Sequence, residues 1–366
     1  MKLHVFNPEH DIALAANLCQ FTAPHAGRQL RSDLGHIPAL WASDGDMVLV
    51  DDVAAALSAV RHLRSNAADV CFVSPDDLRA MHLHGAPSPF DEISVWGWDR
   101  SIVRQLRSVG VTAMLPDDSQ LARIRQMSSR QWAAGHLLGK LASADESFVG
   151  AAWYVTSEDE LQSKAHSFQR VLKAPWSSSG RGVRYELTAE HRQRNEAWAR
   201  NIIRQQGGIM VEPYYNKVVD FGMEFEAAAD GQVRYSGLSV FKTTNGAYVG
   251  SVIASEKAKR EMLGRYLPEG LLEKACEMIC EHTAELFRDA YEGPFGVDMM
   301  VVSDDGVLKL HPCVELNLRR TMGHVALALP ADDTMPQRLM RISYTDKYRL
   351  HIIHTNENVI NTSLVR

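Results

Sequence analysis

The stretch from Gly293 to Arg319 constrains the fold most, because it has the pattern of a β-hairpin that carries acidic side chains. Apolar residues dominate positions 295–302 and 307–317, and the segment Ser303-Asp304-Asp305-Gly306 separates them. An Asp-Gly pair tolerates the positive φ angles of a short hairpin turn, so we predict two antiparallel strands with Asp305 and Gly306 at the centre of the turn. With that turn, Asp298 lies opposite Cys313.

Three polar residues of this hairpin are expected on one face, because side chains along a strand alternate with a period of two. They are Asp298, Glu315 and Asn317, with Glu315 diagonally within reach of Asp298. Shifting the pairing by two residues preserves this arrangement, whereas a shift of one residue separates the two carboxylates. Mg²⁺ typically takes one or two carboxylates and completes its shell with waters and phosphate oxygens. The hairpin therefore predicts a magnesium site, and the alternative is an acidic face exposed to solvent.

Composition indicates an ordinary soluble globular protein. The chain has 366 residues, of which 23% are charged and 45% hydrophobic, enough for two or three subdomains. The net charge of −6, without a basic block, argues against nucleic acid as the main partner. We predict a cytoplasmic protein without a membrane partner, because the N-terminus lacks the apolar core of a signal peptide and no run approaches the roughly 18 apolar residues of a membrane span. The five cysteines include no C-x-x-C pair and are expected to be free thiols.

The first 116 residues alternate between strand and helix patterns. Strands are predicted at 2–6, 46–50, 69–73 and 93–96, with helical patterns such as 101–109 between or after them, which indicates a small parallel sheet. Asn7-Pro8-Glu9 is typical of a helix start with Asn7 as the N-cap. Ligands of such sheets bind beyond the carboxyl ends of the strands, so the turn at 7–11 could contact a substrate. The alternative is that Asn7 simply caps a helix.

The middle of the chain contains a candidate phosphate loop and a candidate hinge. A strand at 170–174 contains Lys173 and precedes the segment 175–183, which is rich in serine and glycine. Small residues let backbone N–H groups approach an anion, and a lysine suits phosphate. However, the segment lacks the G-x-x-x-x-G-K-[ST] pattern of a known phosphate loop. An ordinary hairpin connection therefore explains the segment equally well. A second apolar strand at 209–212 ends in Glu212 before Pro213 and Tyr214. That pattern resembles an interdomain hinge whose free backbone groups pair with a purine edge, but Glu212 could equally be a solvated strand end.

The order of these features resembles the ATP-grasp family. A lysine precedes a Ser/Gly loop, a strand ends in a glutamate, a meander occupies 220–251, and Asp298 precedes the E-x-N-x-R motif of Glu315 to Arg319. The resemblance covers about residues 123–322 and implies an α+β, ATP-grasp fold preceded by an N-terminal α/β (pre-ATP-grasp, Rossmann-like) domain. The implied divisions are 1–116 for the N-terminal domain, 117–206 and 207–330 for the two ATP-grasp subdomains, the second carrying the metal site, and 331–366 for a C-terminal extension.

The resemblance also implies roles for individual residues. Arg130, where the family often has a lysine, and Lys173 would contact phosphates, and Arg319 would face the transferred phosphoryl group, so that Arg319 and Lys173 are the expected catalytic residues. The metal ligands, for one or two Mg²⁺ ions, would be Asp298, Glu315 and Asn317. The remaining ATP contacts would come from Ser178, Ser179, Gly180 and Gly182 over the phosphates, Glu212 and Tyr214 at the adenine, and Asp220 at the ribose.

The implied reaction is an ATP- and Mg²⁺-dependent ligation of two small molecules. A carboxylate attacks the γ-phosphate, and an amine or thiol then displaces phosphate from the acyl phosphate. An ATP-grasp kinase and a nucleotide-binding regulatory protein without turnover are the alternatives. Some members carry a catalytic glutamate shortly after the motif. Here Arg320-Thr321-Met322-Gly323-His324 follows, so carboxylase-like chemistry is not expected. The substrates and the oligomeric state stay open.

Overall fold

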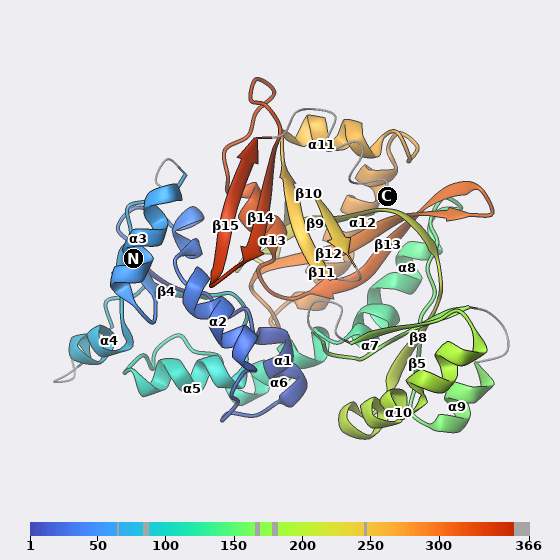
Figure 1. Ribbon diagram of the computed structural model, residues 1–366, viewed down its shortest axis with the longest axis horizontal. Helices are drawn as coiled ribbons and strands as arrows, with labels where there is room; N and C mark the ends of the chain where they lie inside the picture. Colours follow the sequence, from blue (N-terminus) through green and yellow to red (C-terminus); the bar gives the residue numbers. More distant parts are fainter. Residues whose placement is uncertain (64–65, 83–87, 165–168, 178–181, 245–246, 355–366) are drawn as a thin grey trace.

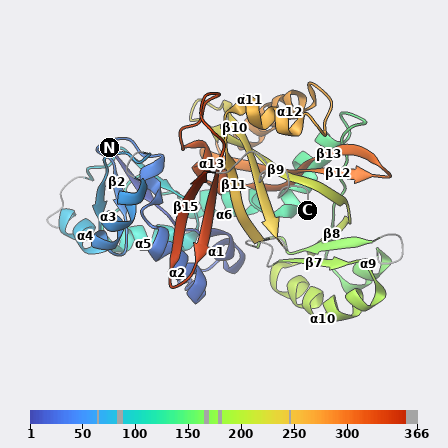
Figure 2. The ribbon, with the colours of Figure 1, turned by 45° about the horizontal axis from the view of Figure 1, so that its top comes forward.

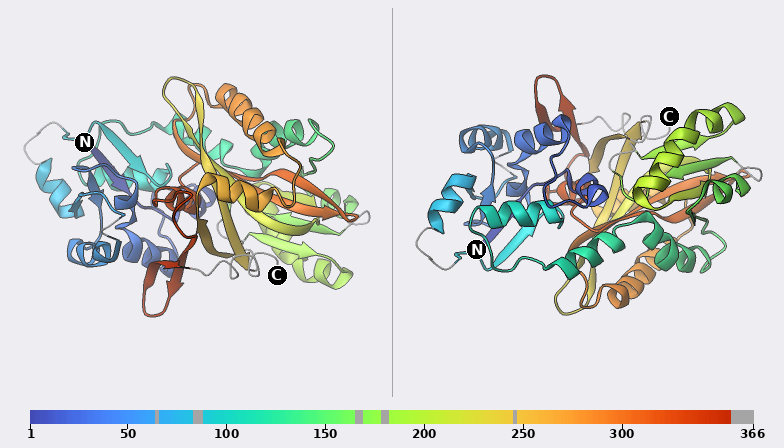
Figure 3. Two further views of the ribbon diagram at one scale, coloured as in Figure 1. Left: turned by 90° about the horizontal axis from the view of Figure 1, so that it is seen from above. Right: turned by 90° about the horizontal axis from the view of Figure 1, so that it is seen from below.

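The computed structural model describes residues 1–63, 66–82, 88–164, 169–177, 182–244 and 247–354. These residues form three β-sheets with helices packed against them (Figure 1). The N-terminal sheet lies at one end of the molecule and the small sheet with α10 at the other, with the largest sheet between them (Figures 2 and 3). None of the helices in the described part of the chain combines the length and apolar character needed to cross a membrane.

The N-terminal domain is the predicted parallel sheet with helices on both faces. Its strands are β1 (Lys2–Val5), β2 (Met47–Leu49), β3 (Cys71–Val73) and β4 (Glu92–Val95), in the order β3-β2-β1-β4. Helices α4 (Pro75–Met81) and α5 (Arg100–Ser108) pack with Leu3 and Val5 on one face. Helix α3 (Val53–Val60) packs with Val48 on the other. The short strands β2 and β3 are continuously apolar, as expected for burial on both faces, whereas β1 and β4 alternate between polar and apolar residues.

Asn7 does not cap the first helix, contrary to the expected helix start. Helix α1 (His10–Ala16) begins later, after Glu9, and α2 (His25–Leu34) follows. The Asn7 side-chain amide donates to the carbonyl oxygen of Gly97 (2.8 Å) and to Asp99 (3.2 Å). It therefore joins the end of β1 to the loop after β4, a long-range contact that local capping rules do not reveal.

The small sheet is antiparallel and is covered on one face. Its strands, in the order β5-β8-β6-β7, are β5 (Trp153–Val155), β8 (Ile209–Pro213), β6 (Arg170–Lys173) and β7 (Val183–Glu186). Helices α9 (Glu158–Ser163) and α10 (Ala189–Gln206) pack against the face that contains Leu172 and Val211. Helix α10 ends at a glycine, Gly207, in the left-handed conformation (φ 83°). The opposite face of this sheet carries Lys173 and Glu212.

The largest sheet contains the predicted meander and the predicted hairpin. Its order is β13-β12-β9-β10-β11-β14-β15. The bounds are β9 (Asn216–Ala227), β10 (Val233–Thr244), β11 (Ala247–Ile253), β12 (Gly293–Asp304), β13 (Val307–Asn317), β14 (Arg338–Tyr344) and β15 (Tyr348–His354). Helix α12 (Leu271–Phe287) packs with Phe221, Phe225 and Phe295 in the main core. Helices α11 (Glu256–Leu263) and α13 (Met322–Leu327) complete this part of the fold.

The helical region predicted before the small sheet contains a wider turn. Helix α6 (Asp118–Met127) is followed by α7 (Arg130–Ala133), a π-helical segment (Ala134–Leu138) and α8 (Gly139–Ala142). Arg130 is the first residue of α7. Leu137 and Leu141 are fully buried in the main core, so this helical region holds Arg130 against the largest sheet.

The hairpin turn is confirmed, but its register changes before the carboxylates. Asp304 pairs with Val307, and the turn residues Asp305 and Gly306 have φ angles of 49° and 85°. The expected pairing of Asp298 with Cys313 is wrong. Met300 pairs with His311, whereas Asp298 pairs with Glu315, so β13 contains two extra residues at this point. Pro312 lies in that interval and cannot donate a ladder hydrogen bond, which accounts for the bulge.

Candidate active site

The two predicted carboxylates lie directly opposite each other on neighbouring strands. Asp298 of β12 pairs with Glu315 of β13, and Gly296 pairs with Asn317 one step along the ladder. The two-residue bulge brings the carboxylates closer than the diagonal arrangement expected from the sequence. Burial, followed by repulsion from Glu315 and Glu224, raises the pKa of Asp298 to about 8. The three predicted metal ligands therefore form one patch, in which the two carboxyl groups disfavour each other's ionisation.

Glu224 is a third carboxylate at this patch that sequence reasoning missed. It lies on β9, which pairs with β12 so that Glu224 is opposite Gly296 and Gly222 is opposite Asp298. The side chain is only 2% exposed, and its Oε2 accepts a hydrogen bond from Thr321 Oγ1 (2.8 Å) and lies 3.0 Å from His324 Nδ1. A charged residue within an apolar strand was visible in the sequence. Its position beside Asp298 depends on the pairing of β9 with β12, which the sequence did not reveal.

Arg130 connects the metal patch to the small sheet. Its Nη2 forms an ion pair with Glu315 Oε1 (2.7 Å), and its Nη1 donates to the carbonyl oxygen of Ala174 and to Ser177 Oγ, both at 2.7 Å. The side chain is 7% exposed. Ser129 caps α7 by accepting from the backbone N–H of Trp132, which fixes the start of the helix that carries Arg130.

Lys173 and Glu212 form a buried ion pair on the face of the small sheet that is opposite α9 and α10. Val171 pairs with Glu212 and Lys173 pairs with Met210, so the charged side chains project from the same face, and Lys173 Nζ lies 2.6 Å from Glu212 Oε2. Cys313, on β13 of the largest sheet, lies near the Lys173–Glu212 pair of the small sheet. Burial, followed by the charges of Asp298 and Glu212, raises the pKa of its thiol to about 12, while Lys173 lowers it. Arg130 contacts both Glu315 and Ala174, which follows β6, so the Lys173 face of the small sheet and the metal patch belong to one region.

The residues predicted for the adenine and the ribose lie around this region. Tyr214 is 38% exposed, and its ring packs edge-to-face with that of Tyr185 at 6.1 Å. Tyr185 pairs with Val171 and so shares the face of Lys173; sequence reasoning did not select it. Asp220 on β9 accepts from Thr243 Oγ1 (2.6 Å) and pairs with Lys217. In the described ranges, no hydrogen bond or ion pair links Asp220 to the other predicted site residues.

The predicted phosphate loop is described only at its two ends. Ser178, Ser179 and Gly180 lie outside the described residues. The carbonyl oxygen of Gly182 accepts from the backbone N–H of Ala174 (2.8 Å). A Cβ at position 182 would overlap the side chain of Ser177, so the two ends of this segment lie against each other and the close approach requires glycine.

Arg319 connects the metal patch to the N-terminal domain. Its Nε and Nη2 donate to the two carboxylate oxygens of Asp11, both at 2.8 Å, and Nη2 also donates to Asn317 Oδ1 (2.9 Å). Asp11 lies on α1, so this ion pair joins the end of β13 to the N-terminal domain, and contact of the turn at 7–11 with a substrate stays a prediction. Asp11 lines a small cavity of about 10 Å³ together with Glu315 and Asn317.

The donor set suits a hard divalent cation that is completed by other oxygens. No cluster of three or more His, Cys, Asp or Glu in the described part of the chain could hold a metal ion by itself. Asp298 and Glu315 provide carboxylates, Asn317 provides an amide oxygen, and the mutual repulsion of the carboxylates favours a cation between them. This combination matches Mg²⁺, which keeps waters or phosphate oxygens in its shell.

Together, the sheets and the site define an ATP-grasp fold, as the sequence predicted, and solved structures share it. An N5-carboxyaminoimidazole ribonucleotide synthetase in complex with ADP is 14% identical, with a TM-score of 0.55 over 99% of this chain and 94% of that one. The N5-carboxyaminoimidazole synthetase of Staphylococcus aureus with ADP is 12% identical, with a TM-score of 0.54 over 99% and 95%. A biotin carboxylase from Campylobacter jejuni is 13% identical, with a TM-score of 0.50 over 93% and 75%. No protein-family model and no curated protein matches the sequence. At these identities the comparison establishes the fold.

Proposed function

We propose that the chain is a cytoplasmic, ATP- and Mg²⁺-dependent ligase that joins a carboxylate to an amine or thiol through an acyl phosphate. The observation that carries this proposal is the patch of Asp298, Glu315 and Asn317, with Arg130, Lys173 and Arg319 around it, on an ATP-grasp fold. Two of the similar structures were solved with ADP and a third with an ATP complex, which supports a nucleotide as the ligand here.

In this proposal the charged residues stabilise the transferred phosphoryl group. Asp298, Glu315 and Asn317 would hold one or two Mg²⁺ ions, which when bound neutralise charge on the phosphates. Arg130 and Lys173 would exchange Glu315 and Glu212 for phosphate oxygens, because charge-assisted hydrogen bonds to phosphate can replace those to carboxylate. Arg319, held by Asp11 and Asn317, would stabilise negative charge at the acyl phosphate.

The remaining predicted residues complete the proposed nucleotide site. Glu212 and Tyr214 would line the adenine and Asp220 the ribose, and the segment of Ser178, Ser179, Gly180 and Gly182 would cover the phosphates. The proposed division into domains is 1–116, 117–206, 207–330 and 331–366. No nucleophilic side chain of the enzyme is required, because the acyl phosphate forms on the substrate carboxylate.

Thermal unfolding with an ATP analogue and Mg²⁺, added separately and together, tests the nucleotide site. Ligand at 100 times its Kd should raise the free energy of unfolding by about 2.7 kcal/mol. Glu315→Ala should lose the Mg²⁺-dependent part of this gain, whereas the control Glu281→Ala, on the exposed face of α12, should keep it. If saturating analogue does not stabilise the wild type, the proposal is wrong.

Phosphate release distinguishes the ligase from the alternatives. A ligase requires both a carboxylate and a nucleophile for sustained turnover, whereas a kinase needs only one acceptor, and a regulatory protein binds nucleotide without releasing phosphate. For a substrate pair that turns over, we expect Glu315→Ala to lower kcat by about 10² to 10³.

A further inference from the structure

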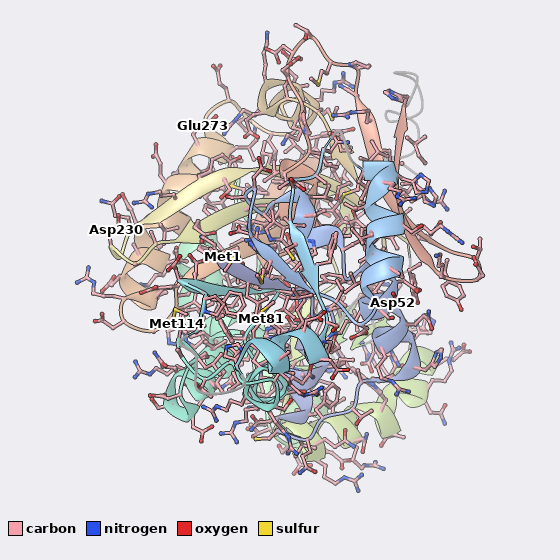
Figure 4. All side chains as sticks on the ribbon, turned by 90° about the vertical axis from the view of Figure 1, so that its left-hand side faces the viewer. Met1, Asp52, Met81, Met114, Asp230 and Glu273 are labelled. Carbon is pink, nitrogen blue, oxygen red and sulfur yellow. The ribbon has the colours of Figure 1, made fainter. Side chains whose placement is uncertain are left out.

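The N-terminal domain contains a cleft of about 360 Å³ beyond the carboxyl ends of its strands. Phe6 directly follows β1, Asp51 comes soon after β2, and Pro75 begins α4 after β3. In an open parallel sheet, ligands bind at this edge, and the volume of the cleft is typical of small-molecule sites. Figure 4 looks onto this domain and labels Asp52, the chain neighbour of Asp51, and Met81 at the end of α4.

The charged residues of the cleft are not all used within the protein. Arg31 forms an ion pair with Glu9 (2.7 Å), and Arg79 pairs with Asp76. Among the residues that the structure describes, neither the Arg28 guanidinium nor the Asp51 carboxylate forms a hydrogen bond or an ion pair, and the backbone N–H of Arg28 donates to the carbonyl oxygen of Pro24. The cleft therefore presents a guanidinium and a carboxylate that are both available to a ligand.

Glu9 adds a buried acceptor at the wall of the cleft. Its side chain is only 8% exposed, one oxygen accepts from Arg31, and Oε2 has no partner within the described ranges. An ionised carboxylate oxygen usually accepts hydrogen bonds, and leaving a buried acceptor unpaired is costly. Oε2 itself is almost inaccessible to solvent, so Glu9 contributes negative charge to the wall of the cleft and not a surface acceptor.

The cleft is separate from the candidate active site. The cleft and the small cavity lie on either side of the start of α1. Glu9, just before the helix, lines the cleft, whereas His10 and Asp11 line the small cavity beside Glu315. None of the residues predicted to bind ATP or Mg²⁺ lines the cleft. Occupation of the cleft therefore does not depend on nucleotide binding.

We propose that this cleft binds a small organic anion that also carries a hydrogen-bond donor, such as an amino acid, a hydroxy acid or a sugar phosphate. The anionic group would bind Arg28, because guanidinium forms charge-assisted hydrogen bonds with carboxylate and phosphate. The donor would bind Asp51, whose carboxylate has no partner in the described part of the chain. A dinucleotide does not fit, because Asn7-Pro8-Glu9 occupies the place of the glycine-rich phosphate turn between the first strand and helix.

The test is calorimetric titration of the full chain with L-aspartate, L-malate, ribose 5-phosphate and inorganic phosphate, with sodium chloride as the ionic-strength control. We expect saturable binding of at least one organic probe, with Arg28→Gln and Asp51→Asn each raising its Kd at least tenfold. The control Arg107→Gln, exposed on α5 and outside the cleft, should leave the Kd unchanged. Binding of L-aspartate or L-malate would identify a carboxylate site, and binding of ribose 5-phosphate a phosphate site.

Three outcomes would overturn the proposal. They are an absence of saturable binding by every probe, equal weakening by Arg107→Gln and Arg28→Gln, and binding of inorganic phosphate that is insensitive to Asp51→Asn. Stabilisation of Arg28→Gln by the ATP analogue and Mg²⁺ should equal that of the wild type, so this result is independent of the proposed ligase activity.

Discussion

Replacing Gly323 by alanine should destabilise the protein, although alanine is the better helix former. Gly323 lies in α13, where the change alone would stabilise the helix by up to about 1 kcal/mol. A Cβ at this position would overlap Glu224 Oε1 and lie 2.6 Å from both Glu224 Cδ and Ser239 Oγ. The carboxylate cannot move freely, because Thr321 binds its other oxygen and Gly296 lies against it.

The expected cost follows from these contacts. Overpacking in a dense interior costs about 1–3 kcal/mol, and weakening the hydrogen bond from Thr321 to a charged acceptor adds roughly 1.5–3 kcal/mol. After subtraction of a helix-propensity gain of about 1 kcal/mol, we expect a net loss of about 1.5–5 kcal/mol, measured from urea unfolding midpoints at a common m-value.

Two comparisons make the prediction specific to Glu224. Gly139→Ala, in α8, has no heavy atom within 4 Å of the new Cβ and should be neutral or stabilising. In a Glu224→Ala background, Gly323→Ala should cost much less, because the overlapping carboxylate is gone. Wild-type stability of Gly323→Ala, or an equal cost in both backgrounds, would refute this reasoning.

Three further changes have defined outcomes. Asp11→Asn should lower the free energy of unfolding by about 2 kcal/mol, because it weakens a two-point ion pair with Arg319, whereas Asp333→Asn on the surface should not. Burial lowers the pKa of His36 to about 4, so on acidification the unfolded chain takes up the proton before the folded protein does. The free energy of unfolding should therefore fall as the pH drops from 6.5 to 4. Relative to His36→Gln, which does not titrate, the fall should reach up to about 3 kcal/mol. Arg130→Lys should keep the positive charge but lose at least one of the contacts to Ala174, Ser177 and Glu315. We expect titration to show that the Kd for the ATP analogue rises about tenfold. An unchanged Kd would mean that the planar geometry of the guanidinium is irrelevant to nucleotide binding.

The hairpin shows what local sequence patterns can predict. Asp305 and Gly306 fixed the turn because both adopt positive φ angles, and the period of two placed Asp298, Glu315 and Asn317 on one face. The exact partner of Asp298 was wrong because Pro312 introduces a bulge. The bulge contains two residues, and an even shift leaves the faces unchanged, so the predicted patch survived the error in register.

The residues that sequence reasoning missed are those placed by distant parts of the chain. Glu224 reaches Asp298 through the pairing of β9 with β12, which are separated by two strands and two helices in the sequence. Asp11 meets Arg319 across 308 positions. Neither contact has a local pattern, because each depends on how complete domains pack.

The basic residues predicted for the site form ion pairs with acidic residues. The sequence predictions, which gave each residue a separate role, did not include these pairs. Arg130 binds Glu315, Lys173 binds Glu212, and Arg319 binds Asp11. The first pair joins α7 to the large sheet, the second joins two strands of the small sheet, and the third joins the large sheet to the N-terminal domain. A polyphosphate would compete with Glu315 for Arg130 and with Glu212 for Lys173. Both carboxylates would then need new partners. In the proposed function Mg²⁺ would be that partner for Glu315, so the charge balance of this site favours nucleotide and metal together over either ligand alone.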